Sequence, residues 1–303
     1  MLASMEGIRD LTREVIAFNL SEPLTHMREV RVRKADGRFE PFDRRKVIRT
    51  CMKLRVGRIE AERIADKISK IVYDGIPTNE ILSAIYEEVK KIRPEYEHAH
   101  DLREAISMMR PKPDFEYFIG ITLSSLGYRV ESARIVDGRC IEHEIDGIAM
   151  KNDEVLMIEV KHHVNPHTYT GLDVFLAVHS TLRDLMDGYR LGLHRYPFTA
   201  ALVACNTKIS QHAERYARCV GIRYMGWRYP RAFALEDLIT RHKLYPLTML
   251  KILKRDHVER LGDKGIVTLK QLIEIDVDRL MEILEIGEKE IEEIKNKARA
   301  ILG

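Results

Sequence analysis

Residues 145–161 constrain this chain more than any other stretch. Two apolar runs, 145–150 and 154–161, flank the polar turn Lys151-Asn152-Asp153, a pattern that predicts a β-hairpin. Asp146 lies on the first run, and Glu159 and Lys161 lie on the second. Because side chains alternate along a strand, Glu159 and Lys161 are expected on one side and Val160 on the other. Two carboxylates and an ammonium group on one patch of a sheet favour a polar site over a core.

The chemistry of these groups indicates a site for a hard divalent cation and a phosphodiester. Mg²⁺ prefers oxygen ligands, and the carboxylates of Asp146 and Glu159 with the carbonyl of Val160 would supply them. Lys161 would orient the attacking water or stabilise the oxyanion. Glu116, on a preceding predicted helix, is expected to reach the same end of the sheet.

Two alternatives compete with this interpretation. The same three charged residues would also suit the solvated face of an amphipathic strand. The motif is flanked by four histidines, His143, His162, His163 and His167. His163 shares strand parity with Lys161 and could contact phosphate, whereas His143 is expected to face away from Asp146. A surface or DNA-facing role is favoured over zinc for this cluster.

Composition places the chain among globular proteins with several domains. With 303 residues, two or three domains are expected. The formal net charge of +3 neither requires nor excludes nucleic acid. No apolar run approaches the roughly 20 residues of a membrane span, and no signal peptide is evident. None of the four cysteines forms a CxxC pair, so the pattern indicates neither zinc nor a disulfide framework and fits a reducing cytoplasm.

Composition shifts and breakers divide the chain into four segments: a leader (1–28, with a short helix at 8–18), a mostly helical module (29–110), an α/β segment (111–244) and a helical C-terminal segment (245–303). The boundary at Pro111-Lys112-Pro113 is a strong breaker. The predicted fold class is therefore multidomain, combining α+β and α/β parts. The α/β segment is predicted as a mixed sheet flanked by helices. Its predicted elements, in chain order, are helix 115–126, strands 128–136, 140–150 and 154–161, helix 172–191, strand 198–205, helix 210–219 and strand 222–227.

The N-terminal module contains a second candidate site, for phosphate. Asp36-Gly37 between two short strand candidates predicts a hairpin, and Asp43 is a candidate N-cap of the next helix. Lys34, Arg38 and Lys46 would then gather near a helix N-terminus, an arrangement that binds phosphate. The alternative is a basic hairpin that is solvated or contacts the DNA backbone. Helices are predicted at 44–54, 59–74, 79–92 and 94–109.

Glu116, Asp146 and Glu159-Val160-Lys161, in this order of elements, resemble the PD-(D/E)XK nuclease superfamily, the restriction-endonuclease-like fold, and within it the Mrr-type and archaeal group. The resemblance covers roughly the middle third of the chain. It implies hydrolysis of DNA phosphodiester bonds with Mg²⁺ or Mn²⁺, with these residues in the catalytic site. Ile145 replaces the proline of the superfamily name, and Glu159 stands where Mrr-type proteins often carry glutamine.

Residues 30–106 resemble the ATP-cone, a nucleotide-sensing module of ribonucleotide reductases and their transcriptional repressor. This resemblance implies ATP or dATP as an effector, with Lys34 and Lys46 at the phosphates. The residues placed about the base and ribose would be Val32, Glu40 and Asp43. Ala35 replaces the usual arginine of a Lys-Arg pair, and Arg33 or Arg38 would have to compensate.

Residues 261–300 resemble helix-hairpin-helix domains of the SAM-like type. The loop Gly262-Asp263-Lys264-Gly265 is the candidate for binding a DNA phosphate through backbone N–H groups. The last helix instead carries four carboxylates that oppose phosphate contact, Glu288, Glu290, Glu292 and Glu293. Dimerisation and DNA binding are about equally favoured for this segment.

Together these observations predict a cytoplasmic, metal-dependent DNA endonuclease that ATP or dATP gates through a change in a homo-oligomer. The main alternative is a non-catalytic, nucleotide-responsive DNA-binding regulator. A nuclease for RNA or damaged DNA is a second alternative. No membrane partner is expected.

Overall fold

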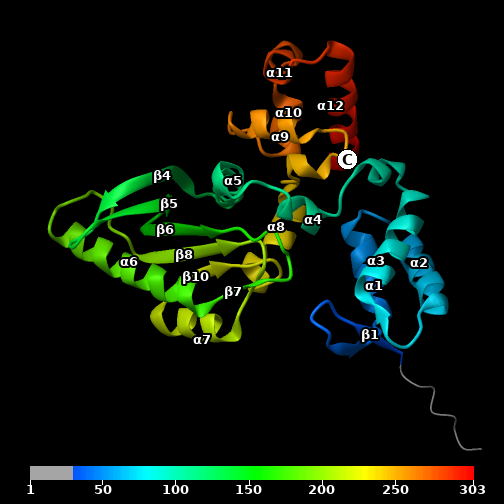
Figure 1. Cartoon of the computed structure of the whole chain (residues 1–303), viewed down its shortest axis with the longest axis horizontal. Helices are drawn as coiled ribbons and strands as arrows, with labels where there is room; N and C mark the ends of the chain where they lie inside the picture. The colour runs from blue at the N-terminus through cyan, green and yellow to red at the C-terminus, as the bar shows by residue number, and fades with distance from the viewer. Residues whose placement is uncertain (1–29) are drawn as a thin grey trace, which may run out of the picture.

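The computed structural model describes residues 30–303, so the helix predicted at 8–18 lies outside the described residues. Three parts are visible in Figure 1: a helical N-terminal part, a sheet flanked by helices, and a C-terminal group of helices. Helix α8 (Leu235–His242) lies between the sheet and the N-terminal part. Among the helices of residues 30–303, none is long and apolar enough to cross a membrane.

The N-terminal part begins with the predicted hairpin. Strand β1 (Arg31–Arg33) pairs antiparallel with β2 (Phe39–Pro41). Gly37 turns the chain with a φ of +81°, a backbone conformation that glycine adopts without a steric cost. Strand β3 (Ile76–Pro77), which the sequence analysis did not predict, pairs parallel with β1 and gives the order β2-β1-β3.

Four helices follow the hairpin, although the last one predicted is divided. They are α1 (Arg44–Lys53), α2 (Arg58–Ile71), α3 (Thr78–Lys90) and α4 (Leu102–Ser107). Asp43 caps α1 as predicted, accepting a hydrogen bond from the Arg45 N–H. The single helix predicted at 94–109 is wrong. A 3-10 helix, η1 (Pro94–His98), ends before Asp101, whose carboxylate accepts from two backbone N–H groups and starts α4 as a separate helix.

The central sheet contains every strand predicted for the α/β segment. Its order is β10-β8-β6-β5-β4. The strands are β4 (Arg129–Asp137), β5 (Glu142–Lys151), β6 (Glu154–Lys161), β8 (Ala200–Cys205) and β10 (Arg223–Met225). Neighbours β4, β5 and β6 pair antiparallel, whereas β8 and β10 extend the sheet in parallel. The sheet is therefore mixed, as predicted.

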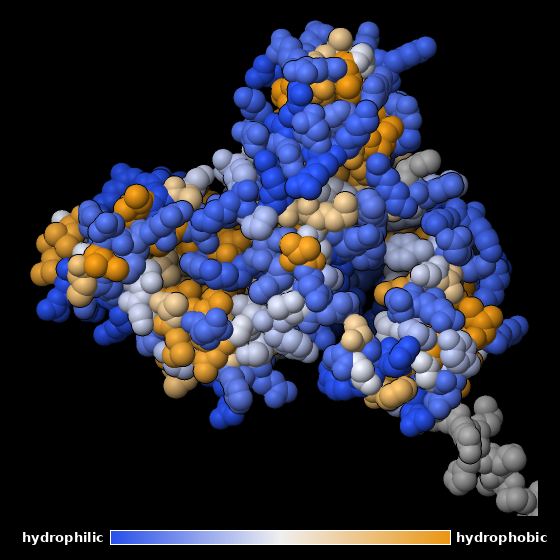
Figure 2. Space-filling model, in the orientation of Figure 1, coloured by the Kyte–Doolittle hydropathy of each residue, from blue (hydrophilic) through white to orange (hydrophobic). Residues whose placement is uncertain are grey.

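Helices cover both faces of this sheet. Helix α5 (Glu116–Ser125) and α8 share a core with Leu156 and Ile158 of β6. Helices α6 (Leu172–Arg190) and α7 (Gln211–Val220) share the other core with Met157. A small parallel sheet of β7 (Tyr169–Thr170) and β9 (Lys208–Ile209), not predicted, lies beside them. Hydrophobic side chains on the face in Figure 2 form separate small groups, as expected when the apolar faces are covered.

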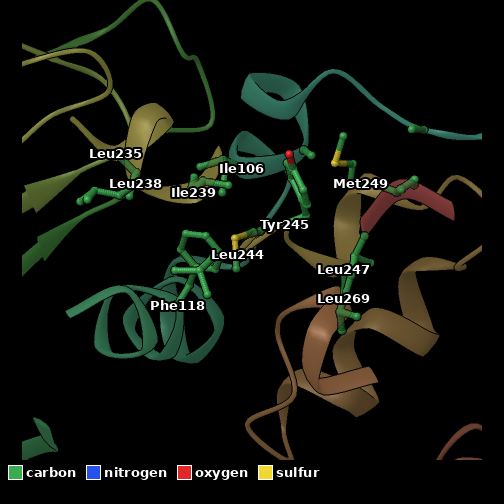
Figure 3. Packing of buried hydrophobic residues seen from close by; sticks show 14 of the residues in the cluster. Ile106, Phe118, Leu235, Leu238, Ile239, Leu244, Tyr245, Leu247, Met249 and Leu269 are labelled. Carbon is green, nitrogen blue, oxygen red and sulfur yellow. The ribbon is translucent and has the colours of Figure 1, made fainter. Parts of the chain in front are cut away.

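The three parts of the chain share a continuous hydrophobic core. Figure 3 shows Ile106 of α4, Phe118 of α5 and Ile239 of α8 near Leu244 and Tyr245, which lead into the C-terminal helices. Those helices are α9 (Arg255–Gly262), α10 (Leu269–Glu274), α11 (Val277–Leu284) and α12 (Glu288–Leu302). Because the core is continuous, a shift in one part is felt by its neighbours.

The loop at Gly262, predicted to bind a DNA phosphate, begins with an internal contact. A Cβ on Gly262 would lie 2.2 Å from Oδ1 of Asp114, so any other residue there would displace the Asp114 carboxylate. Arg110 bonds both Asp114 and Asp263, at 2.7 and 2.8 Å. The start of this loop is therefore used to attach the C-terminal helices to the linker before α5.

Candidate functional site

The first candidate site lies where the pairing of β5 and β6 ends. The last paired positions are Gly147 and Ile158, and Asp146 and Glu159 follow directly on the two strands. Oδ2 of Asp146 accepts a hydrogen bond of 2.7 Å from the N–H of Val160. The Asp146 side chain is only 9% exposed, so this bond fixes it against the backbone between Glu159 and Lys161.

Lys112 joins this carboxylate to two others. Its ammonium lies 3.1 Å from Oδ1 of Asp146, 3.1 Å from Oε1 of Glu116 and 3.2 Å from Oε1 of Glu144. The structure thus brings Glu116 and Asp146 together across the α5–β5 contact. The sequence analysis missed Lys112, although its spacing of four residues from Glu116 is a signal for an ion pair.

Charge and burial determine how this cluster titrates. Burial raises the pKa of Glu116, and the neighbouring Asp146 adds to the rise while Lys112 opposes it. Burial alone would lower the pKa of Lys112, but its hydrogen bonds to Glu116 and Asp146 raise that pKa above the usual value. A cation is therefore strongly favoured between these carboxylates, and in this structure it is the lysine ammonium.

The ligand set predicted for a metal is not assembled in this structure. Glu159 pairs with Lys161, at 2.7 Å between Oε1 and Nζ, and Asp146 pairs with Lys112. Val160 presents its N–H to Asp146. Across residues 30–303, no group of three or more His, Cys, Asp or Glu side chains is placed to hold a metal ion. The physical reason is that a separate ammonium group neutralises each of the two carboxylates.

The flanking histidines contact other elements. His143 bonds Asp184 of α6 at 2.8 Å, which turns it away from Asp146 as predicted. Nε2 of His162 donates to the carbonyl of Ile106 on α4 at 2.9 Å. His163 bonds the hydroxyl of Thr170 at 3.2 Å. His162 therefore links the end of β6 to α4.

The second candidate site is a cavity of about 760 Å³ between the N-terminal part and the sheet domain. Ligand pockets commonly have volumes of about 300–1,000 Å³. All six residues proposed for nucleotide binding line it: Val32, Lys34, Arg38, Glu40, Asp43 and Lys46. The hairpin and α1 thus bring together side chains that the sequence analysis grouped by motif alone.

Glu40 is the centre of the polar contacts on this side of the cavity. Its Oε2 lies 2.9 Å from Nζ of Lys46 and 3.1 Å from Nζ of Lys34. These two lysines hold the pKa of Glu40 below its usual value, Lys46 first. Arg38 pairs instead with Asp36 at 2.7 Å. The two lysines predicted to contact phosphates therefore converge on one negative charge.

Further charged residues line the cavity outside the short hairpin motif. Lys53 of α1 bonds Glu236 of α8 at 2.7 Å, and Arg228 bonds the same carboxylate at 2.7 Å. Although burial would raise the pKa of Glu236, these partners hold it below the usual value. Arg103 and Trp227 also line the cavity. No sequence pattern relates residues this far apart, so only the fold reveals them.

Two family models match parts of this chain. Residues 30–111 match the family model described as ATP cone domain, which confirms the resemblance inferred from the hairpin motif. Residues 245–302 match the model described as AF1548-like, C-terminal. The ATP-cone and the AF1548-like C-terminal domain are therefore both present in this chain.

Two relatives of this chain come from Archaeoglobus fulgidus. An uncharacterized protein of that organism is 33% identical over 181 residues, 60% of this chain and 98% of the relative. A second one is 42% identical over 41 residues, covering 14% of this chain and 87% of the relative. The crystal structure of the protein of unknown function AF1548 is similar with a TM-score of 0.54 and 31% identity, covering 62% of this chain and 97% of the other. Because it spans nearly the whole of a relative at 33% identity, the chain belongs to this AF1548-like family and carries an ATP-cone domain as well.

Proposed function

We propose that this protein is a metal-dependent DNA endonuclease regulated by ATP or dATP. The observation that carries the proposal is the contact between Asp146 and the backbone of Val160, with Glu116 beside the same carboxylate. The acidic groups and the lysine of the Glu…Asp…Glu-x-Lys pattern come from three elements and gather at one end of a mixed sheet. This arrangement supports the resemblance to restriction-endonuclease-like nucleases.

The carboxylates of Glu116 and Asp146 fit the coordination preferences of a magnesium ion. Mg²⁺ usually takes one or two carboxylates, keeps several waters and binds a substrate phosphate. Glu116 and Asp146 meet that demand. A strand residue directs its N–H and C=O to the same neighbour, so the Val160 carbonyl faces the strand of Asp146. When bound, the ion would activate water and neutralise charge on the scissile phosphate.

The other residues would act around that centre. Lys161 is less buried than the two carboxylates, with 42% of its side chain exposed, and would stabilise negative charge that develops on the phosphate. Glu159 holds Lys161 in place through their ion pair. Lys112 would have to leave Glu116 and Asp146 as the divalent ion enters.

Nicking of plasmid DNA in Mg²⁺ or Mn²⁺ tests the endonuclease. Wild-type protein should nick, whereas Asp146→Asn and Lys161→Ala should not. Asp153→Asn is the matched control, because Asp153 is exposed in the turn at the other end of the same hairpin. Equal nicking by Asp146→Asn and Asp153→Asn, or none by the wild type, would refute the proposal.

A second function is favoured by the two ammonium groups that neutralise Asp146 and Glu159. In that case the protein is a non-catalytic, nucleotide-responsive DNA-binding regulator. It would retain DNA in a mobility shift assay in EDTA and leave every DNA and RNA substrate intact in Mg²⁺.

Nucleotide regulation rests on the ATP-cone and its cavity. Binding of ATP or dATP should raise the melting temperature, because a ligand of the folded state stabilises it. The double variant Lys34→Ala with Lys46→Ala should lose this shift. Lys70→Ala, an exposed change on α2 away from the cavity, should keep it. A full shift in the double variant would exclude the hairpin lysines from the site.

A further inference from the structure

Arg103 is a cationic side chain in the cavity with an unsatisfied donor. It lies on α4, and its Nη2 donates to the carbonyl of Pro166. Its Nε is buried without a hydrogen-bond partner, and within residues 30–303 no carboxylate is within salt-bridge distance of its guanidinium. Burial, with the nearby Arg228, lowers the pKa of Arg103, although the charges of Asp101 and Glu236 act in the opposite direction. Arg103 is half-buried, and a guanidinium shielded from water without an ion-paired carboxylate is a candidate group for binding an anion.

Two further side chains that carry hydrogen-bond donors, Trp227 and Lys208, line the same cavity from the sheet domain. Nε1 of Trp227 is also buried without a partner, and the Arg103 guanidinium lies 6.0 Å from the centre of the Trp227 ring. Lys208 of β9 is exposed and contacts the ring of Tyr169 at 5.6 Å. Among the described side chains, no carboxylate forms an ion pair with Lys208. Among the described residues, these three donor-bearing side chains thus line the cavity without a carboxylate in salt-bridge contact.

The charge of the cavity as a whole indicates its ligand. Eight lining side chains are lysine or arginine and five are aspartate or glutamate, so an anion is favoured. The hairpin with Lys34 and Lys46 approaches the sheet domain closely enough for Lys208 to act on Asp36. The pKa of Asp36 is lowered to about 2, mainly by Arg38 and in smaller part by Lys208. Both walls therefore present cations to one space.

We propose that Arg103, Trp227 and Lys208 form a phosphate subsite, so that the polyphosphate of one nucleotide is bound jointly by the ATP-cone and the sheet domain. This inference rests on the proposed nucleotide function and adds the sheet-domain contacts to it. When the nucleotide repositions the two side chains and uncovers these donors, the phosphate oxygens accept from Nε of Arg103 and Nε1 of Trp227, and Lys208 neutralises the terminal phosphate. Charge-assisted hydrogen bonds of this kind are about twice as strong as neutral ones.

Hydrogen bonds from helix α4 connect the subsite to the first candidate site. Arg103 holds Pro166, in the loop after β6. From the same helix, the Ile106 carbonyl accepts from His162, the residue after Lys161. A nucleotide that repositions Arg103 therefore acts on both ends of the segment that follows the Glu159-Val160-Lys161 motif. Joint binding gives the ATP-cone a means to change that motif.

Intrinsic fluorescence reads this subsite directly, because Trp227 is the only tryptophan in the chain. ATP, ADP and AMP are titrated into the full-length protein, and calorimetry measures each affinity in parallel. We expect a saturable change in Trp227 emission with ATP, and tighter binding of ATP than of AMP.

Variants separate the subsite from the rest of the cavity. Arg103→Met should weaken the binding of ATP at least about tenfold, the factor expected for loss of one charge-assisted hydrogen bond. The same change should weaken the binding of AMP by much less. Lys208→Ala changes an exposed side chain and should not impair folding. It should also weaken the binding of ATP. Arg63→Ala on α2 is the matched control and should leave ATP affinity unchanged.

The outcomes distinguish the two proposals. If calorimetry shows no nucleotide binding by the wild type, the proposed nucleotide regulation fails, and the subsite with it. If the wild type binds ATP but Arg103→Met and Lys208→Ala bind it equally well, the phosphate subsite is refuted while the ATP-cone function stands.

Discussion

Replacement of Lys112 by methionine tests whether an ammonium group occupies the cation position of the candidate nuclease site. Three carboxylate oxygens lie 3.1–3.2 Å from Nζ of Lys112. The side chains of Glu116 and Asp146 are only 12% and 9% exposed, whereas that of Lys112 is 58% exposed. The lysine is therefore screened by solvent, although two of its partners are not.

These exposures set the expected magnitude. Loss of one partner from a buried ion pair costs about 3–5 kcal/mol, and exposed pairs contribute about 0–1 kcal/mol. Because Lys112 is between these limits, Lys112→Met should lower the free energy of unfolding in EDTA by about 1–3 kcal/mol. Lys70→Met, at an exposed position of α2, should change it by less than about 0.5 kcal/mol.

Magnesium should narrow the difference in the free energy of unfolding between the two proteins. In the wild type the divalent ion must displace the ammonium, whereas in Lys112→Met it meets two unpaired carboxylates. Each 1.4 kcal/mol corresponds to a factor of about ten in affinity, so the variant should bind Mg²⁺ at least about tenfold more tightly. Calorimetry with Mg²⁺, and urea unfolding with and without the ion, measure both effects. Equal Mg²⁺ affinities in variant and wild type would refute the reasoning.

Three further changes probe the fold and its titration. The pKa of Glu116 is raised in the folded state, so its ionised form destabilises the protein above that pKa. Glu116→Gln should therefore increase the free energy of unfolding by about 0.5–1 kcal/mol at pH 7, and urea titrations should show this gain vanish as the pH falls. The pKa of Glu236 is lowered in the folded state, so its ionised form stabilises the protein above the unfolded pKa near 4.5, and this stabilisation is lost on acidification. Glu236→Gln should therefore lower the free energy of unfolding by about 2–4 kcal/mol at pH 7 and by little at low pH. A loss of stability that does not depend on pH in thermal melts would contradict this. A Cβ on Gly188 would lie 2.7 Å from the carbonyl of Asp137, so Gly188→Ala should cost about 1–3 kcal/mol in denaturant midpoint assays, while Gly287→Ala, with nothing within 4 Å, should cost far less.

Elements set by local chemistry could be predicted from the sequence. The turn at Asp36-Gly37, the cap at Asp43 and the alternating strands of the hairpin 145–161 each depend on residues close in the chain. Parity also placed Glu159 and Lys161 on one side of β6, where they form an ion pair. Such features are decided before tertiary contacts form, so a short sequence window contains their cause.

Features that depend on approach between distant segments could not be predicted. The helix predicted at 94–109 has a periodic apolar pattern, but Asp101 caps a new helix within it. Strands β7 and β9 have two residues each and exist only because the loops after β6 and β8 meet. The position of Lys112 between Glu116 and Asp146 depends on the path of the linker relative to the sheet, and no local sequence pattern predicts that path.

One segment belongs to both candidate sites, and this connection shapes any regulation between them. Asp101 and Arg103 at the start of α4 line the nucleotide cavity, while Lys112, soon after the same helix, contacts Glu116 and Asp146. Ile106 between them is fully buried in the core shared by the domains. A rigid, packed helix transmits a displacement at one end to the other. A nucleotide that draws Arg103 toward its phosphates therefore acts on the linker that carries Lys112, and the ammonium group that neutralises the carboxylates becomes the element through which the ATP-cone could open the site to a divalent ion.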